Sequence, residues 1–204
     1  MGTILAREQL VERLSPGRAR GTRVVFTNGV FDLLHLGHLR YLQAARALGD
    51  LLVVGVNSDA STRQLKGPAR PLVPEDERAE MLSGLACVDY VTIFGEPTAE
   101  ATLALLRPAV YVKGADYAQH ADRQQDSLLT AEALRQALST DPDLGTRLPE
   151  ARIVADYSGS LALLAYLPGH STSELIERIV ARFGPEAEID ATRGTHVTDA
   201  NTTG

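Results

Sequence analysis

Two histidines, His35 and His38, stand three residues apart in the segment 28–38 (NGVFDLLHLGH). Residues three apart on a helix lie on nearly one face, and a helix start offers free backbone N–H groups at its positive end. Imidazoles that donate hydrogen bonds add to the stabilisation of a bound polyphosphate, and Gly37 between them lets a ligand approach the backbone. The spacing predicts a site for phosphoryl-group chemistry.

Other sites built on this turn fit the sequence less well. A dinucleotide-binding turn needs G-x-G-x-x-G and a Walker A loop ends in Gly-Lys-Ser/Thr, and residues 29–38 contain neither pattern. A zinc site needs further ligands, but Cys87 is the single cysteine and no second carboxylate stands at ligand spacing nearby. We therefore predict no protein metal ligands. The structural alternative is one packed and one capping histidine.

Lysine is rare, because the 20 basic residues include only Lys66 and Lys113. A compact, flexible ammonium can do what a guanidinium fork cannot, so each lysine is a candidate for a function. Lys66 and Arg70 lie in residues 60–74, which are rich in turn formers and which we predict to be a loop. A lysine on a loop can move with the negative charge that develops on a departing pyrophosphate. The structural alternative is that Lys66 is a solvated side chain with no role in the site.

The elements that must position these residues alternate between strand and helix. Apolar runs predict strands at 24–27, 51–56, 90–94, 110–112, 153–155 and 161–164. Periodicity and capping residues predict helices at 4–14, 37–49, 75–85, 98–107 and 171–183. This order predicts an α/β domain with a doubly wound, mostly parallel, Rossmann-like sheet. Ligands bind such sheets beyond the carboxyl ends of the strands.

We expect one domain over residues 1–184. Within it, residues 118–150 carry six acidic and three basic residues and a helical stretch near 128–138, and we predict a surface insertion there. In the closing helix 171–183, Ile176, Ile179, Val180 and Phe183 share one face. Residues 185–204 are polar and without periodicity, which predicts a disordered tail.

Composition narrows the class of protein. A net charge of −6 argues against non-specific nucleic-acid binding through a basic surface. No apolar run approaches the roughly 20 residues that a membrane helix needs, and the first residues lack the order of a signal peptide. We expect a cytoplasmic protein with no nucleic-acid or membrane partner, and leave a homo-oligomer open.

Residues 29–38 resemble the H-x-G-H motif of the cytidylyltransferase-like nucleotidyltransferase superfamily. Further stretches resemble its adenylyltransferases that activate D-glycero-β-D-manno-heptose 1-phosphate with ATP. They are NSDASTRQLKGPARPLVPEDERAEML (57–82), VDYVTIFGEPT (88–98), RPAVYVKGADY (107–117) and PGHSTSELIERI (168–179). The resemblance covers about residues 5–117 and 151–183.

The resemblance implies a set of site residues. His35, His38 and Lys66 would be catalytic, on the phosphates. Nucleotide-binding residues would be Thr27, Asn28, Gly29, Phe31, Gly37, Lys113, Asp116, Ser171 and Thr172, and Arg70 and Arg78 would bind substrate. The residues themselves agree at two places: Lys113 and Asp116 follow a strand at its carboxyl end, and Ser171 opens a helix. Arg78 could instead be a solvated residue or pair with Glu75.

The resemblance also implies the reaction: AMP passes from ATP, with Mg²⁺, to a sugar 1-phosphate made by another enzyme. One alternative is a CTP-dependent cytidylyltransferase acting on glycerol 3-phosphate or another polyol phosphate. Those enzymes carry Arg-Thr-x-Gly-Ile-Ser-Thr where this chain has Tyr166 to Thr172, and the missing arginine favours ATP. The other alternative, a non-catalytic nucleotide-binding regulatory module, would be favoured by damage to the histidine pair or to Lys66, and both are intact.

Overall fold

The computed structural model describes residues 1–114, 126–165, 167 and 169–184. The expected tail 185–204, Asp116 and the first part of the expected insertion lie outside the described residues. Among the helices that are described, none combines the length and the apolar character needed to cross a bilayer.

In the described part of the chain, seven strands form one sheet. In spatial order they are β1 (Thr3–Ile4), β4 (Tyr90–Phe94), β3 (Leu51–Asn57), β2 (Val24–Gly29), β5 (Val110–Gly114), β7 (Ser160–Leu164) and β6 (Ser127–Leu129). Neighbouring strands are parallel except β6 and β7. The strand order reverses at β2, which has β3 on one side and β5 on the other. The predicted doubly wound, mostly parallel sheet is confirmed.

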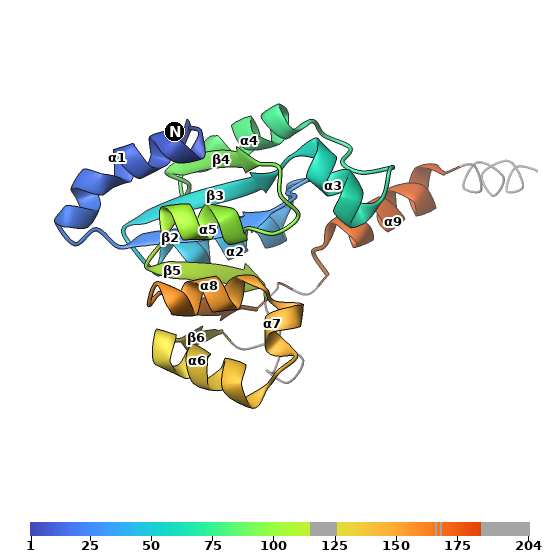
Figure 1. Ribbon diagram of the computed structural model, residues 1–204. Helices are drawn as coiled ribbons and strands as arrows, with labels where there is room; N and C mark the ends of the chain where they lie inside the picture. The colour runs from blue at the N-terminus through green and yellow to red at the C-terminus, as the bar shows by residue number, and fades with distance from the viewer. Residues whose placement is uncertain (115–125, 166, 168, 185–204) are drawn as a thin grey trace, which may run out of the picture.

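Helices cover both faces of the sheet (Figure 1). One face carries α1 (Arg7–Ala19), α5 (Glu100–Leu106), α6 (Ala131–Thr140) and α8 (Glu150–Asp156); the other carries α2 (Leu36–Arg46) and α4 (Glu75–Ser83). Side chains alternate along β2, so Val25 enters one hydrophobic cluster and Phe26 the other. The shorter α3 (Asp59–Lys66) and α7 (Leu144–Arg147), and α9 (Thr172–Phe183), lie towards the carboxyl ends of the strands.

Two predicted elements were wrong. Residues 153–155 belong to helix α8 rather than to a strand, because a short apolar run does not distinguish a buried strand from a buried helix. Residues 60–66 belong to helix α3 rather than to a loop. Ser58 caps that helix by accepting a hydrogen bond from the Ser61 N–H at 3.1 Å, and the turn formers begin only at Gly67.

The described part of the expected insertion does more than cover the surface. Residues 127–129 form the edge strand β6, and α6 and α7 follow it. Leu134 and Leu148 are 0% and 1% exposed and belong to the core on the α5 face. The segment therefore contributes core side chains and also leads the chain to Glu150 at the start of α8.

Helix α9 does not pack its predicted apolar face against the sheet. It extends away from the carboxyl ends of the strands (Figure 1), and Ile179, Val180 and Phe183 are exposed. Only its first turn is placed to take part in a site at that edge of the sheet.

Candidate active site

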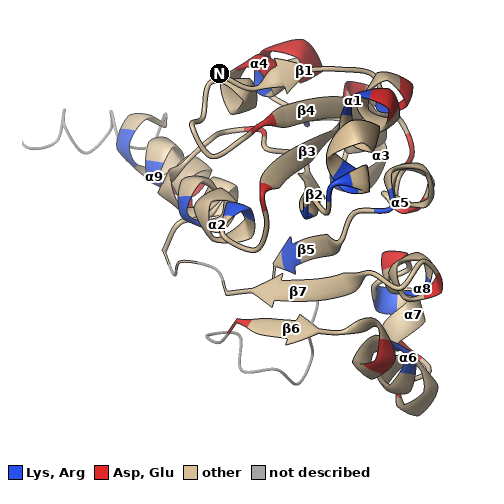
Figure 2. Ribbon diagram, turned by 90° about the vertical axis from the view of Figure 1, so that its left-hand side faces the viewer, with Lys and Arg blue, Asp and Glu red and all other residues tan. Residues whose placement is uncertain are grey.

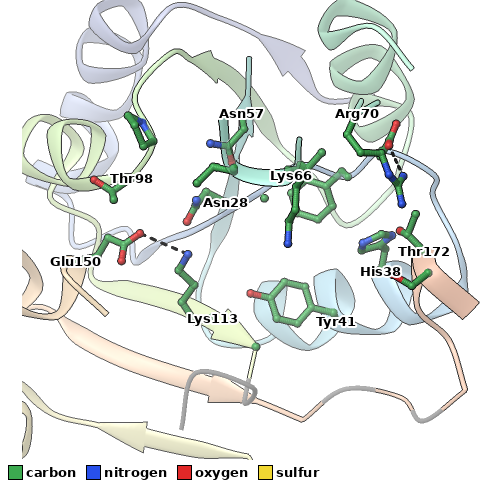
Figure 3. A pocket seen from close by; sticks show the side chains of 18 of the residues that line it. Asn28, His38, Tyr41, Asn57, Lys66, Arg70, Thr98, Lys113, Glu150 and Thr172 are labelled. Atoms are coloured by element: carbon green, nitrogen blue, oxygen red, sulfur yellow. Dashed lines mark hydrogen bonds and ion pairs between the residues drawn. The ribbon is translucent and has the colours of Figure 1, made fainter. Parts of the chain in front are cut away.

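A cavity of about 500 Å³ opens at the carboxyl ends of the central strands (Figure 3). It lies at the strand-order reversal, where sheets of this kind bind ligands. Eight of the residues predicted for the site line it: Asn28, Gly29, Phe31, His38, Lys66, Arg70, Lys113 and Thr172. Figure 2 shows basic residues at the end of β5 and on α3, both at this edge of the sheet.

The histidine pair sits at the start of α2 as predicted. His35 is the N-cap residue, and its Nδ1 accepts a hydrogen bond from the His38 N–H at 3.3 Å. The two rings are stacked with centroids 3.8 Å apart, and Phe31 packs edge-on against His38 at 5.3 Å. His38 lines the cavity and His35 does not, so the cap and the stack fix the ring that faces the ligand space.

Both imidazoles are held in their neutral form. Burial, followed by the neighbouring His35, lowers the pKa of His38 to about 4. Burial also lowers the pKa of His35, with a smaller contribution from His170. A neutral imidazole carries one N–H donor, so His38, which lines the cavity, can offer a phosphate a hydrogen bond but no positive charge before ligand arrives.

The shifted pKa of His38 predicts that stability falls as pH is lowered from about 6.5 to about 4. The unfolded chain binds a proton there near the ordinary value of 6.5, whereas the folded protein binds it only near 4. Between these two pH values the unfolded state binds more protons than the folded state does. This difference lowers the free energy of unfolding by about 1–3 kcal/mol. Urea denaturation at about pH 7 and about pH 4.5 should show a smaller pH effect in His38→Asn. An equal effect in both proteins would contradict this account.

Gly37 packs closely against the segment that precedes α9. It does not line the cavity. A Cβ atom at this position would lie 2.6 Å from the carbonyl oxygen of His170 and 2.9 Å from His35 Nδ1. The absence of a side chain at Gly37 therefore allows the segment before α9 to approach the histidine turn.

Lys66 and Arg70 reach the cavity from α3 and the loop that follows it. Lys66 is the last residue of α3 and is exposed. Arg70 forms an ion pair with Asp32 at 2.5 Å, and Asp32 also accepts the N–H groups of Leu72 and Val73 at 2.7 and 3.0 Å. Asp32 thus ties the histidine turn to the Arg70 loop.

The first turn of α9 lies beside His38 (Figure 3). Ser171 is the N-cap residue: its Oγ accepts the Glu174 N–H at 3.1 Å, and the Glu174 carboxylate accepts the Ser171 N–H at 2.8 Å. Ser171 is therefore occupied by the cap, and Thr172 and Ser173 line the cavity. Two helix starts, those of α2 and α9, converge on one end of the cavity.

Arg78 and Thr27 lie outside the cavity lining, contrary to expectation. The Arg78 side chain is fully buried and donates to the carbonyls of Val73, Val30 and Asn57 and to the Asp59 carboxylate. Its donors are directed at protein acceptors rather than at substrate. The Thr27 hydroxyl is likewise buried, 2.7 Å from Tyr41 Oη and 3.0 Å from the Val112 carbonyl oxygen.

Several lining residues were missed, among them Tyr41, Asn57, Arg147 and Glu150. Tyr41 follows His38 by three residues on α2, and Asn57 ends a predicted strand, so helix spacing and the strand-end rule could have found both. Glu150 had no such signal, because it closes a polar segment that was predicted to be surface. It forms an ion pair with Lys113 at 3.4 Å.

The family model for cytidylyltransferase-like proteins matches residues 26–178. The chain belongs to the cytidylyltransferase-like family. The match begins on β2 and ends within α9, so it includes both helix starts that meet at the cavity. The predicted family, recognised from the H-x-G-H turn, is confirmed.

Relatives of this cytidylyltransferase-like chain are named bifunctional protein HldE. Those of Trichlorobacter lovleyi and Syntrophotalea carbinolica are 42% and 44% identical over 88% of this chain, and that of Geobacter sulfurreducens is 45% identical over 83%. The chain spans 29–31% of the length of these relatives. A lipopolysaccharide core biosynthesis protein from Thermoplasma volcanium matches with 33% identity and a TM-score of 0.44, over 59% of this chain and 89% of that one.

The described residues contain no cluster of three or more His, Cys, Asp or Glu side chains that could hold a metal ion. Each of the two acidic side chains that line the cavity is paired with a basic side chain that also lines it, Asp32 with Arg70 and Glu150 with Lys113. Mg²⁺ is commonly bound through substrate phosphates and water. This donor set suits a Mg²⁺ ion that enters with a nucleoside triphosphate as part of the substrate.

Proposed function

We propose that this protein transfers AMP from ATP to a sugar 1-phosphate and releases pyrophosphate. The proposed acceptor is D-glycero-β-D-manno-heptose 1-phosphate, with ADP-heptose as product. The observation that carries this proposal is the cavity at the H-x-G-H turn, in a chain 42–45% identical to HldE proteins. The proposed catalytic groups are His35, His38 and Lys66.

In the proposed reaction, an oxygen of the acceptor's phosphate attacks the α-phosphorus of ATP in line. A P–O bond forms between the two substrates, and the bond from the α-phosphorus to the β-phosphate oxygen breaks. The electron pair leaves with pyrophosphate. Because the acceptor is already an anion, no side chain has to act as nucleophile or general base, and no covalent enzyme intermediate forms.

The protein's part in this proposal is to position the substrates and stabilise charge. The triphosphate would lie at the end of the cavity where α2 and α9 begin, with Mg²⁺ bound to it as substrate. His38 and the first turn of α9 would donate hydrogen bonds to phosphate oxygens. Lys66 would follow the charge that moves onto the leaving pyrophosphate, since its long side chain is exposed at the end of α3.

The proposal predicts that pyrophosphate release with a heptose 1-phosphate is faster with ATP than with CTP, by roughly tenfold or more. The reason is the absent arginine before the Ser171–Thr172 turn. Coupled pyrophosphate detection with ATP, CTP, GTP and UTP, each against heptose 1-phosphate and glycerol 3-phosphate, makes the comparison. Mass spectrometry identifies the nucleotide product.

A turnover with CTP and glycerol 3-phosphate equal to or above that with ATP would overturn the heptose assignment. It would leave the roles of His38 and Lys66 in phosphoryl transfer intact, because those rest on the cavity and not on the base. Nucleotide binding without pyrophosphate release from any pair would instead favour the regulatory module.

A further inference from the structure

The wall of the cavity opposite the histidines contains a buried ion pair. Lys113, at the end of β5, and Glu150, at the start of α8, are 3.4 Å apart, with side chains 9% and 5% exposed. Glu150 Oε1 also accepts the Ala99 N–H at 3.4 Å. Both side chains line the cavity, and Figure 3 shows them on the far side of Lys66 from His38 and Thr172.

The contribution of this ion pair to the free energy of folding does not explain why it is present. Desolvating two charges costs several kcal/mol per ion, and well-packed apolar residues of similar volume commonly do as well or better. A buried ion pair that forms part of a cavity wall is therefore better explained by what enters the cavity.

The charge of the pair indicates which part of a substrate it meets. Lys113 pairs with Glu150, and Arg147, which also lines the cavity, pairs with Asp141 at 2.5 Å. Because each of these cations has an anionic partner, this end attracts phosphate weakly. The other end combines two helix starts with Lys66, which forms no ion pair among the described residues. Phosphates therefore favour the histidine end, and a neutral group is left to the Glu150 end.

The chemistry of the pair selects hydroxyl groups. A carboxylate accepts hydrogen bonds and an ammonium donates them, so neighbouring hydroxyls of a sugar can donate to Glu150 and accept from Lys113. Thr98 lies at the same end (Figure 3) and adds a hydroxyl. Charged and hydroxyl-bearing side chains suit a polyhydroxylated ring better than they suit a flat purine.

We propose that Glu150 is a specificity-determining residue that binds ring hydroxyls of the acceptor sugar, with Lys113 as its partner rather than as the nucleotide-binding residue that the resemblance implied. This inference rests on the proposed function and deepens it: the segment that leads to α8 supplies the acceptor's hydroxyl subsite. The ribose of the nucleotide carries the same chemistry, and the experiment separates the two sources.

The test is steady-state kinetics of Glu150→Gln with ATP and heptose 1-phosphate. The expected result is an acceptor KM raised about 10- to 100-fold, the range for a lost charge-assisted hydrogen bond. The KM for ATP should change less than about threefold. The matched control is Glu96→Gln, because Glu96 pairs with Arg7 at 2.7 Å and lies outside the cavity lining. That control should behave as wild type.

Acceptors that each lack one ring hydroxyl identify the contact. If Glu150 binds a given hydroxyl, the deoxy acceptor raises KM in the wild type but adds little in Glu150→Gln, because the two losses are not additive. If Glu150 only stabilises the fold or positions Lys113, each deoxy acceptor will raise KM by the same factor in Glu150→Gln as in the wild type. That result overturns the proposal. The proposal is also overturned if Glu150→Gln raises the KM for ATP as much as it raises the KM for the acceptor.

Glu150→Gln leaves Lys113 buried without its anion, so the melting temperature is measured first. If this variant does not fold, the double variant Glu150→Leu, Lys113→Met replaces the pair by apolar side chains and should show the same rise in acceptor KM. A wild-type protein that transfers AMP to no aldose 1-phosphate overturns the proposed function, and this inference with it. An active wild type with an unaffected Glu150 variant overturns the inference alone.

Discussion

A fully folded His38→Ala variant should turn over about 10²–10³ times more slowly than the wild type. His38 lines the cavity at the start of α2, and in the proposed reaction its neutral ring would donate to charge that builds up on the transferring phosphate. Losing a donor that acts mainly in the transition state lowers kcat and changes ATP affinity much less. Pyrophosphate release at saturating ATP and acceptor measures kcat, and isothermal calorimetry measures ATP binding.

Two controls separate chemistry from folding. His38→Asn keeps a shorter donor and should retain more activity than His38→Ala. Melting curves identify a ring that matters mainly for packing, since such a variant would lose about 2 kcal/mol or more of stability together with folded protein. A folded His38→Ala protein with wild-type kcat would remove His38 from the reaction.

The sequence predicted the fold well because most of its strands are buried on both faces. Residues 90–94 form β4 with the predicted bounds, since a short, β-branched apolar run between polar residues has few other structures open to it. The same reasoning failed at 153–155, where an equally apolar triplet lies in α8. There the turn formers on either side, Pro149 and Ser158–Gly159, bound a short helix as readily as they bound a strand.

The site was predicted only in part, for reasons that concern side-chain direction. The strand-end rule placed Lys113 at the cavity and the resemblance implied Asn28, but neither says which way each side chain points. Thr27 precedes Asn28 by one residue and turns its hydroxyl into the sheet–helix packing instead, as alternation along a strand requires. Sequence spacing located the edge of the sheet, and only the packed structure assigns the side chains to it.

Glu150 illustrates a second limit of sequence reasoning. Residues 118–150 are polar and charged, which is typical of a solvated excursion, and the resemblance to the family covers the chain on either side of them. Leu134 and Leu148 nevertheless enter the core, and the chain then delivers one carboxylate to the cavity. A single buried charge among many exposed ones has no signature in composition.

Arg78→Met should lower the free energy of unfolding by about 3–5 kcal/mol, as expected when one partner of a buried, hydrogen-bonded charge is removed. The Arg78 guanidinium joins the Val30 turn after β2, the end of β3 at Asn57 and the Val73 loop before α4. Its loss leaves those carbonyls and the Asp59 carboxylate without their donor, and each unsatisfied buried group carries its own desolvation cost. Urea denaturation measures the loss.

This result would distinguish the buried arginine of the structure from the substrate-binding arginine that the resemblance implied. Arg78→Lys keeps the charge but not the planar fork, so it should recover only part of the lost stability. The control is Arg63→Met on α3, where an exposed arginine is replaced and stability should stay within about 0.5 kcal/mol of wild type. If Arg78 instead bound substrate, Arg78→Met would keep wild-type stability and raise a KM. Because the Val30 turn leads into the H-x-G-H segment, we expect the folded fraction of Arg78→Met to have reduced kcat as well, with His38 displaced from the phosphate end of the cavity.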